Sequence, residues 1–346
     1  MKPRIGVFAL GGTIAMVRGD AGGVRPGLGA EDLAAAVPEL PALCELRLET
    51  VAKLGSPNIT VDAVFALAAR IEALAAAGEI DGAVVTQGTD TLEETAFLLD
   101  CLLDLAIPVC AIGAMRNPLM ASHDGPGNLL AAVKVAADGT VRALARELGV
   151  LVVMLDGVHA AQEVVKTNSH RLEAFASPHG GPIGAIIEER VRITAMPVRP
   201  HLEAMRRAVG ASPAARLAGR PRPVGLVAFA LDETGALLKA AARAGDRLGY
   251  RGMVLALMGG GHAPEWLVDD IEALAQAVPT VGCGRMGNGL LLRTTYEMRG
   301  AERDLQSRGV IWGGRLHPLK ARLLLDLLLR ADAPPDRIRE VFEAFN

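Results

Sequence analysis

Short, continuous apolar runs that alternate with helical patterns constrain the fold of this chain more than any other feature. The apolar runs predict strands at Ile5–Leu10, Gly82–Thr86, Pro108–Ile112, Gly149–Leu155, Val224–Ala230 and Met253–Met258. The helical patterns cover Val61–Ala77, Thr91–Leu103, Asn128–Ala137, Ala236–Ala244, Pro264–Ala277, Pro318–Leu329 and Pro335–Ala344. Strands that are apolar on both faces, with a helix between them, are typical of a mostly parallel sheet covered by helices. The sequence therefore predicts an α/β fold.

The length of the chain and one proline-rich stretch predict two domains. A chain of 346 residues is longer than a single core usually supports. Residues 197–223 contain five prolines, which remove backbone donors and disfavour helix in the residue before each of them. We predict a larger N-terminal domain at 1–200 with a mostly parallel sheet, a linker at 201–222, and a smaller C-terminal α/β domain at 223–346.

Composition excludes several classes of protein. The formal net charge is −3, from 36 basic and 39 acidic residues that are dispersed along the chain, so we expect no nucleic-acid partner. No apolar run reaches the roughly 18 residues of a membrane span, and Ile5–Leu10 is too short for a secretory signal. The four cysteines lack CxxC spacing, and without an export signal we expect reduced thiols and a cytoplasmic location.

Three polar segments follow predicted strands, where the sites of parallel α/β sheets gather. Thr13 comes directly after two glycines, which allow a close approach of the backbone to a ligand. An ordinary turn with a capping threonine is the alternative interpretation. Thr89 and Asp90 lie where a strand meets a helix N-terminus, which suits an anion, and Asp90 can instead bind an ammonium group. Lys166, if it lies beside a threonine and an aspartate, can polarise the hydroxyl.

Other polar residues receive structural interpretations. The spacing of Thr91 and Glu94 is that of a capping box, so we expect Thr91, Glu93 and Glu94 to serve the start of the helix. The seven histidines show no metal-ligand spacing and are expected in loops or on the surface, among them His123, His159, His170 and His179. The sequence thus predicts neither a metal nor a cofactor.

Two longer motifs resemble the signatures of the bacterial-type L-asparaginase family. They are GGTIA at 11–15 and GTDTLEETA at 88–96. Smaller matches occur in the same order at Gly55-Ser56, Gly113-Ala114-Met115-Arg116, Asp124-Gly125-Pro126, Asn128-Leu129, Lys166-Thr167-Asn168, Pro318, and Lys320-Ala321-Arg322. The resemblance covers nearly the whole chain and is weakest over 200–223 and 259–300.

The resemblance implies a two-domain α/β hydrolase, assembled as a dimer of dimers, that converts L-asparagine to L-aspartate and ammonia. By this resemblance Thr13 is the nucleophile, and Thr89, Asp90 and Lys166 form a second catalytic cluster. Substrate contacts are implied for Ser56, Thr89 and Asp90 and for the backbone carbonyl of Ala114. Glu302 matches an acidic residue that completes the site of the neighbouring subunit.

The chain also departs from the family pattern. The family's mobile loop normally supplies a tyrosine, but residues 16–31 contain none, and the two tyrosines of the chain are Tyr250 and Tyr296. The glycine-rich loop can still act as a lid. Pro57 replaces a common glutamine, and Gly260 replaces an asparagine of the intersubunit contact. Since lost hydrogen bonds change selectivity, we expect asparagine to be preferred over glutamine.

Three further functions remain open at this point. One is an amidohydrolase that acts on glutamine or a related amide. Another is an amidotransferase subunit, although those relatives usually carry an extra N-terminal domain and this chain begins close to its first strand. The last is a sensor that binds asparagine or aspartate without hydrolysing it, since the loop tyrosine is missing.

Overall fold

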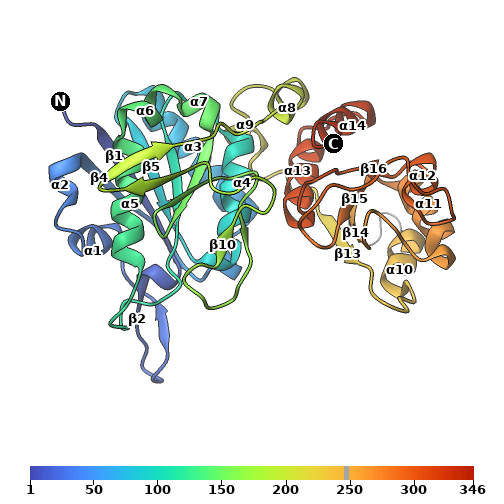
Figure 1. Cartoon of the computed structure of the whole chain (residues 1–346), viewed down its shortest axis with the longest axis horizontal. Coiled ribbons are helices and arrows are strands. Elements are labelled where there is room, and N and C mark those ends of the chain that lie inside the picture. The colour runs from blue at the N-terminus through green and yellow to red at the C-terminus, as the bar shows by residue number, and fades with distance from the viewer. Residues whose placement is uncertain (245–248) are drawn as a thin grey trace. The chain divides into compact units, whose positions relative to one another are not determined.

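The computed structural model describes residues 1–244 and 249–346, which form two compact units, Met1–Val198 and Arg199–Asn346 (Figure 1). Each unit has its own sheet. Each also has its own cluster of buried hydrophobic side chains.

Within residues 1–198, all of them described, the first unit is built on an eight-stranded sheet in the order β12-β11-β8-β7-β6-β5-β1-β4. Its strands are β1 (Arg4–Gly11), β4 (Glu45–Leu54), β5 (Gly82–Thr86), β6 (Val109–Ile112), β7 (Val150–Met154), β8 (Gly157–Ala160), β11 (Gly184–Ile187) and β12 (Arg190–Ile193). Strands β4, β1, β5, β6 and β7 are parallel, and the other three pair antiparallel at one edge. Two small hairpins complete the strands: β2 (Met16–Arg18) with β3 (Val24–Pro26), and β9 (Val165–Lys166) with β10 (Phe175–Ala176).

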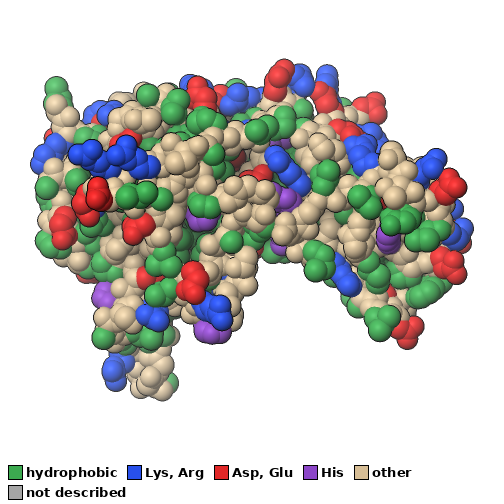
Figure 2. Space-filling view, viewed as in Figure 1, with side chains coloured by type: hydrophobic (Ala, Val, Ile, Leu, Met, Phe, Trp, Pro, Cys, Tyr) green, Lys and Arg blue, Asp and Glu red, His purple; other side chains and the backbone are tan. Residues whose placement is uncertain are grey.

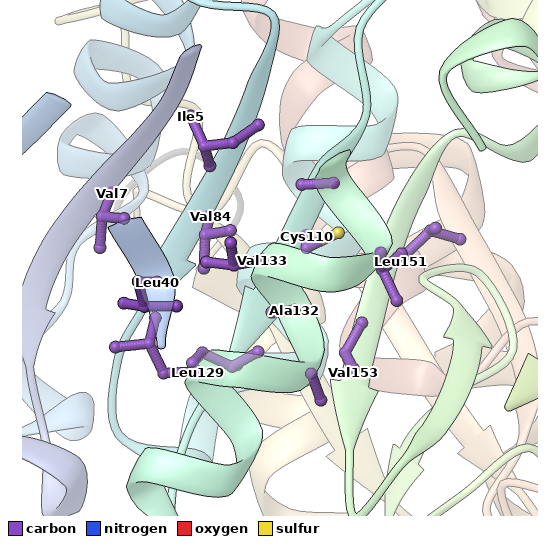
Figure 3. Close-up of a cluster of buried hydrophobic side chains, with 14 of the residues drawn as sticks. Ile5, Val7, Leu40, Val84, Cys110, Leu129, Ala132, Val133, Leu151 and Val153 are labelled. Atoms are coloured by element: carbon purple, nitrogen blue, oxygen red, sulfur yellow. The ribbon is translucent and has the colours of Figure 1, made fainter. Parts of the chain in front are cut away.

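Helices cover both faces of this sheet (Figure 1). They are α1 (Ala30–Ala35), α2 (Leu40–Leu43), α3 (Val61–Ala76), α4 (Leu92–Leu102), α5 (Gly125–Ala137), α6 (Gly139–Ala143) and α7 (Ala145–Leu148). On the face covered by α5, Leu129 and Val133 lie against Val84 of β5 and Cys110 of β6, as Figure 3 shows. These side chains are almost fully buried, as expected for strands that are apolar on both faces.

The second unit contains a parallel sheet in the order β13-β14-β15-β16. The strands are β13 (Val224–Ala228), β14 (Gly252–Leu257), β15 (Thr280–Gly284) and β16 (Ile311–Trp312). The helices are α8 (His201–Val209), α9 (Pro213–Leu217), α10 (Ala236–Ala244), α11 (Val268–Ala277), α12 (Glu302–Ser307), α13 (Pro318–Arg330) and α14 (Pro335–Glu343). The indole of Trp312 is buried in the core of this unit.

The α/β fold class expected from the sequence is confirmed, and every strand and helix predicted there corresponds to an element of the structure. The predicted linker at 201–222 contains α8 and α9, which belong to the second unit. Helix α8 packs against α14, and Arg207 forms an ion pair with Glu340 at 2.6 Å. The domain boundaries at 200 and 223 stay a prediction.

Two further expectations concern cysteines and charge. All four cysteines are free and buried, which confirms the expectation of reduced thiols. Basic and acidic side chains are interspersed over the face shown in Figure 2. Among the described residues, no helix combines the length and apolar character needed to cross a membrane.

Candidate active site

The loops that follow four neighbouring strands meet at one edge of the first unit's sheet. Strands β4, β1, β5 and β6 lie side by side and parallel, so their carboxyl ends share this edge. The residues that follow them are Ser56 after β4, Thr13 after β1, Thr89 after β5 and Ala114 after β6. The topology therefore brings together four residues that lie up to 101 positions apart in the chain.

The loop that carries Thr13 is in direct contact with the loop that carries Thr89. Gly12 has a φ angle of +82°, and a Cβ atom built on it would lie 1.9 Å from the backbone nitrogen of Gly88. A Cβ on Gly88 would lie 2.7 Å from the hydroxyl of Ser56. Glycine is needed at both positions because any side chain would force these loops apart. The half-buried Thr13 is thus placed next to the Thr89 loop.

The Ala114 loop is held against the same cluster from the other side. A Cβ on Gly113 would lie 2.7 Å from the methyl group of Thr89. The buried Asn128 donates to the carbonyl of Gly113 at 3.0 Å and accepts from the backbone N–H of Leu155 at 3.0 Å. Fully satisfied buried amides of this kind rigidify a loop. Ala114 itself is buried.

Asp124 fixes the next turn of the same loop. Its carboxylate accepts from the backbone N–H groups of Met115 at 2.9 Å and Arg116 at 2.8 Å. It also accepts from the amide of Asn128 at 3.1 Å. The Asp124 and Asn128 matches noted in the sequence therefore support the loop rather than lie in the cluster of threonines.

Lys166 joins the cluster from β9, outside the main sheet. Its ammonium donates to the hydroxyl of Thr89 at 2.9 Å and to the carboxylate of Asp90 at 2.7 Å. The Lys166 side chain is 14% exposed, whereas that of Asp90 is 61% exposed. The sequence left open whether Lys166 approaches Thr89, and the structure places the two in contact. A cation that donates to a hydroxyl oxygen stabilises the alkoxide form of that hydroxyl.

Asp90 is held ionised by its partners. The hydrogen bond from Lys166 is the main cause that lowers the pKa of the Asp90 carboxyl below its ordinary value of 3.8. Burial opposes this effect, while the positive charge of Lys166 and a 3.1 Å hydrogen bond from Ser56 add to it. A carboxylate that is ionised and open to solvent can accept a cationic ligand group.

The capping box predicted at the start of α4 is not formed. Thr91 occupies the N-cap position, but its hydroxyl makes no capping bond and donates to the carbonyl of Ser56 at 3.1 Å. The carboxylate of Glu93 accepts the backbone N–H of Lys166. Tertiary partners therefore replace the local ones, and Glu93 is a site residue that its place in the GTDTLEETA motif could have indicated.

Glu302 lies in the second unit and is buried there. Its carboxylate accepts the backbone N–H of Tyr296 at 2.5 Å and lies 3.4 Å from the ring of His262. Burial raises the pKa of Glu302, but backbone hydrogen bonds led by that of Tyr296 outweigh this and lower it. The structure places Thr13, Ser56, Thr89, Asp90, Ala114 and Lys166 in the first unit. Glu302 is not among them.

Two histidines contradict the expectation of loop or surface positions: His201 is fully buried at the start of α8, and His159 is buried in a strand. His159 is buried in β8, and its Nδ1 lies 2.9 Å from the hydroxyl of Ser177. Burial lowers the pKa of His159 to about 4, so the ring is neutral at pH 7. Val158 and Ala160 on either side of it are buried as well, so this strand is covered on both faces and alternation could not have placed His159 inside. Within the described part of the chain, no group of three or more His, Cys, Asp or Glu residues could hold a metal ion.

At the carboxyl edge of the sheet, the hydroxyl of one threonine contacts a lysine ammonium and lies beside a carboxylate, and a second threonine lies on the adjoining loop. This arrangement is that of an α/β protein that uses a hydroxyl group as a nucleophile. The family model "Asparaginase, N-terminal" matches residues 4–199, and "Glutaminase/Asparaginase C-terminal domain" matches residues 224–342. The chain belongs to the asparaginase family.

Individual relatives agree with this assignment. The chain is 34% identical to a protein of Haemophilus influenzae named "Probable L-asparaginase periplasmic", over 99% of this chain and 93% of the relative. It is also 34% identical to L-asparaginase 2 of Escherichia coli, with the same two coverages. The crystal structure of a probable cytoplasmic L-asparaginase from Campylobacter jejuni superposes with a TM-score of 0.84 at 30% identity, covering 99% of each chain.

Proposed function

We propose that this chain is an L-asparaginase that hydrolyses L-asparagine to L-aspartate and ammonia, with Thr13 as the nucleophile. The chain is an amidohydrolase of the asparaginase family, which acts on small-molecule amides. The observation that carries the finer proposal is the contact of Lys166 with both Thr89 and Asp90, on a loop that touches the Gly12–Thr13 loop.

The arrangement suits the binding of a small amino acid. The ionised carboxylate of Asp90 is exposed and is the natural partner of the α-ammonium group of asparagine. The hydroxyl of Ser56, buried beside it, is positioned to bind the α-carboxylate. The backbone carbonyl of Ala114 accepts from the side-chain amide of the substrate. One ion pair and one hydrogen bond at the amino-acid end of the substrate orient its side-chain amide toward the threonines.

The reaction proceeds in two steps. The Thr13 oxygen attacks the side-chain amide carbon, and the C–N bond breaks as the nitrogen leaves as ammonia with the proton of the hydroxyl, so an ester forms at Thr13. Water then attacks the ester carbon, and its proton returns to Thr13 as aspartate is released. Thr89 and Lys166 transfer protons and stabilise the charge that develops on the reacting groups.

The missing loop tyrosine changes how Thr13 is activated. The hairpin of β2 and β3 follows Thr13, and residues 16–31, which include it, contain no tyrosine. We propose that the Thr89–Lys166 pair supplies the activation, and that Pro57 and Gly260 leave asparagine preferred over glutamine. A panel of amides that includes glutamine, with kcat/KM measured for each, tests this preference. A higher value for glutamine than for asparagine would reject it.

The central test is ammonia release from L-asparagine by purified protein. Thr13→Ala and Thr89→Val should each lower kcat by at least about 1000-fold, because each removes a hydroxyl from the reacting centre. Thr60→Ala, which removes an exposed hydroxyl that caps the start of α3, is the matched control and should keep its kcat. Undiminished turnover in either cluster variant rejects the mechanism. Binding of L-aspartate in calorimetry without any hydrolysis by the unmodified protein would favour a sensor instead.

The assembly and location of the protein are also proposals. We propose a dimer of dimers in which Glu302 completes the neighbouring subunit's site, supported by its match to the family's acidic residue. A molar mass near that of one chain in light scattering would contradict it. We propose a cytoplasmic location, supported by four reduced thiols and by the name of the Campylobacter jejuni relative. Fractionation of cells that express the full gene tests it.

A further inference from the structure

Glu93 contacts the backbone of the same lysine whose ammonium serves the cluster. Its carboxylate accepts the N–H of Lys166, and its side chain is only 5% exposed. Thr89 and Asp90, four and three positions before Glu93, accept hydrogen bonds from the Nζ atom of Lys166. The segment from Thr89 to Glu93 therefore contacts Lys166 at its backbone N–H and at its ammonium.

The next residue, Thr167, donates its N–H and its hydroxyl to the carbonyl of Ala174 at 2.7 and 3.0 Å, whereas the N–H of Lys166 itself has Glu93 as its partner. Strand β9 has two residues, and its ladder with β10 pairs Lys166 only with Phe175 and Val165 only with Ala176. A lysine side chain has four rotatable bonds, so its ammonium stays in place only if its backbone is fixed as well. The carboxylate of Glu93 lies in the first turn of α4, where the helix dipole favours a negative charge.

We infer that Glu93 is a positioning residue for the amidase reaction, which fixes the backbone of Lys166 so that its ammonium stays on Thr89 and Asp90. This inference rests on the proposed function. Glu93 does not touch the substrate; its effect on the reaction passes through Lys166. A displacement of about 1 Å of a catalytic group is enough to cost about 100-fold in rate.

Two substitutions at position 93 separate hydrogen bonding from packing. Glu93→Gln keeps an acceptor oxygen at the same distance along the side chain, whereas Glu93→Met keeps a similar size without a comparable acceptor. We expect Glu93→Met to lower kcat by about 10- to 100-fold with a smaller change in KM, and Glu93→Gln to recover kcat to within about fivefold of the unmodified enzyme. Glu94→Gln and Glu94→Met, in the same helical turn, are the matched controls for the loss of a carboxylate near the dipole.

A double-mutant cycle with Lys166→Met decides between positioning and a general structural role. If Glu93 acts through the lysine, Glu93→Met should change the residual kcat of Lys166→Met by less than about twofold, because no ammonium is left to position. Equal fold-changes in the two backgrounds would overturn the inference. If Glu93→Met fails to fold, as judged by circular dichroism, the same cycle with Glu93→Gln applies, and its smaller loss should likewise vanish.

The outcomes also separate this inference from the proposed function. Absence of ammonia release by the unmodified enzyme from every amide would overturn both. Activity that falls with Lys166→Met but not with Glu93→Met would overturn only the role of Glu93. Losses with Glu94→Met as large as those with Glu93→Met would assign the effect to the helix start, and would overturn the role of Glu93 as well.

Discussion

Replacing Gly12 by alanine should disable the site while most of the fold is retained. The new Cβ would lie 1.9 Å from the nitrogen of Gly88, whereas contact needs about 3.5 Å, so the two loops must separate by about 1.5 Å. A displacement of this size between the Thr13 and Thr89 loops should lower kcat by about 100-fold or more. The φ angle of +82° adds strain of about 1–2 kcal/mol.

The expected loss of stability follows from the same two effects. Backbone strain and forced overpacking together should lower the free energy of unfolding by about 3 kcal/mol. Gly78→Ala is the matched control, because Gly78 has a φ angle of +63° and nothing within 4 Å of the added Cβ. It should cost only about 1 kcal/mol and leave kcat unchanged.

The two variants are compared by ammonia release from L-asparagine and by denaturant unfolding. The reasoning is refuted if folded Gly12→Ala keeps its kcat within twofold. It is also refuted if Gly12→Ala loses no more stability than Gly78→Ala. In either case the loops do not depend on the direct contact of two glycine backbones.

Four further outcomes follow from the structure. Because the pKa of Asp90 is lowered below 3.8, KM for asparagine should stay flat as the pH falls from 7 to 5, and Asp90→Asn should raise KM throughout this range. The buried His159 has a folded-state pKa of about 4, lowered from 6.5, so its contribution to the free energy of unfolding is present above pH 6.5 and is lost as the pH falls toward 4. At pH 5 the free energy of unfolding should be about 2 kcal/mol lower than at pH 7, and His159→Gln should reduce this difference. Asn128→Leu leaves the carbonyl of Gly113 and the N–H of Leu155 unpaired and should cost about 3 kcal/mol in denaturant unfolding, with a raised KM. Burial raises the pKa of Cys44 to about 11 and that of Cys110 to about 12, so iodoacetamide at pH 8 should leave the folded protein unmodified and active; rapid labelling would contradict this.

The elements that the sequence predicted best are those with a clear run or period of apolar residues. Strand β5 has the predicted boundaries because it is buried throughout and forms a continuous apolar run, and helix α10 has them because its apolar residues follow a helical period. Strand β4 was missed, because most of its side chains are partly or fully exposed and its pattern mixes charge with apolar residues. An edge strand of this kind has no strong sequence signal.

In the candidate site, some residues could be predicted from local sequence signals, and others depend on contacts between distant parts of the chain. Thr13, Thr89 and Asp90 could be chosen from strand ends and glycines, which are local signals. The approach of Lys166 and the role of Glu93 depend on a contact between residues 73 positions apart, which no local pattern contains. Thr91 and Glu93 were misassigned for this reason, since a capping box and a tertiary contact use the same residue types.

The positions of the two tryptophans make them intrinsic fluorescent probes of one part of the molecule. The two tryptophans of the chain are Trp266 and Trp312, and both belong to the second unit, where the indole of Trp312 is buried among core side chains. Intrinsic fluorescence excited at the indole band therefore reports on the second unit alone. Loss of ammonia release reports on the whole site, which in the proposed assembly also uses Glu302 of the second unit. The melting of the second unit can thus be followed beside the loss of activity in one sample, without attaching a dye.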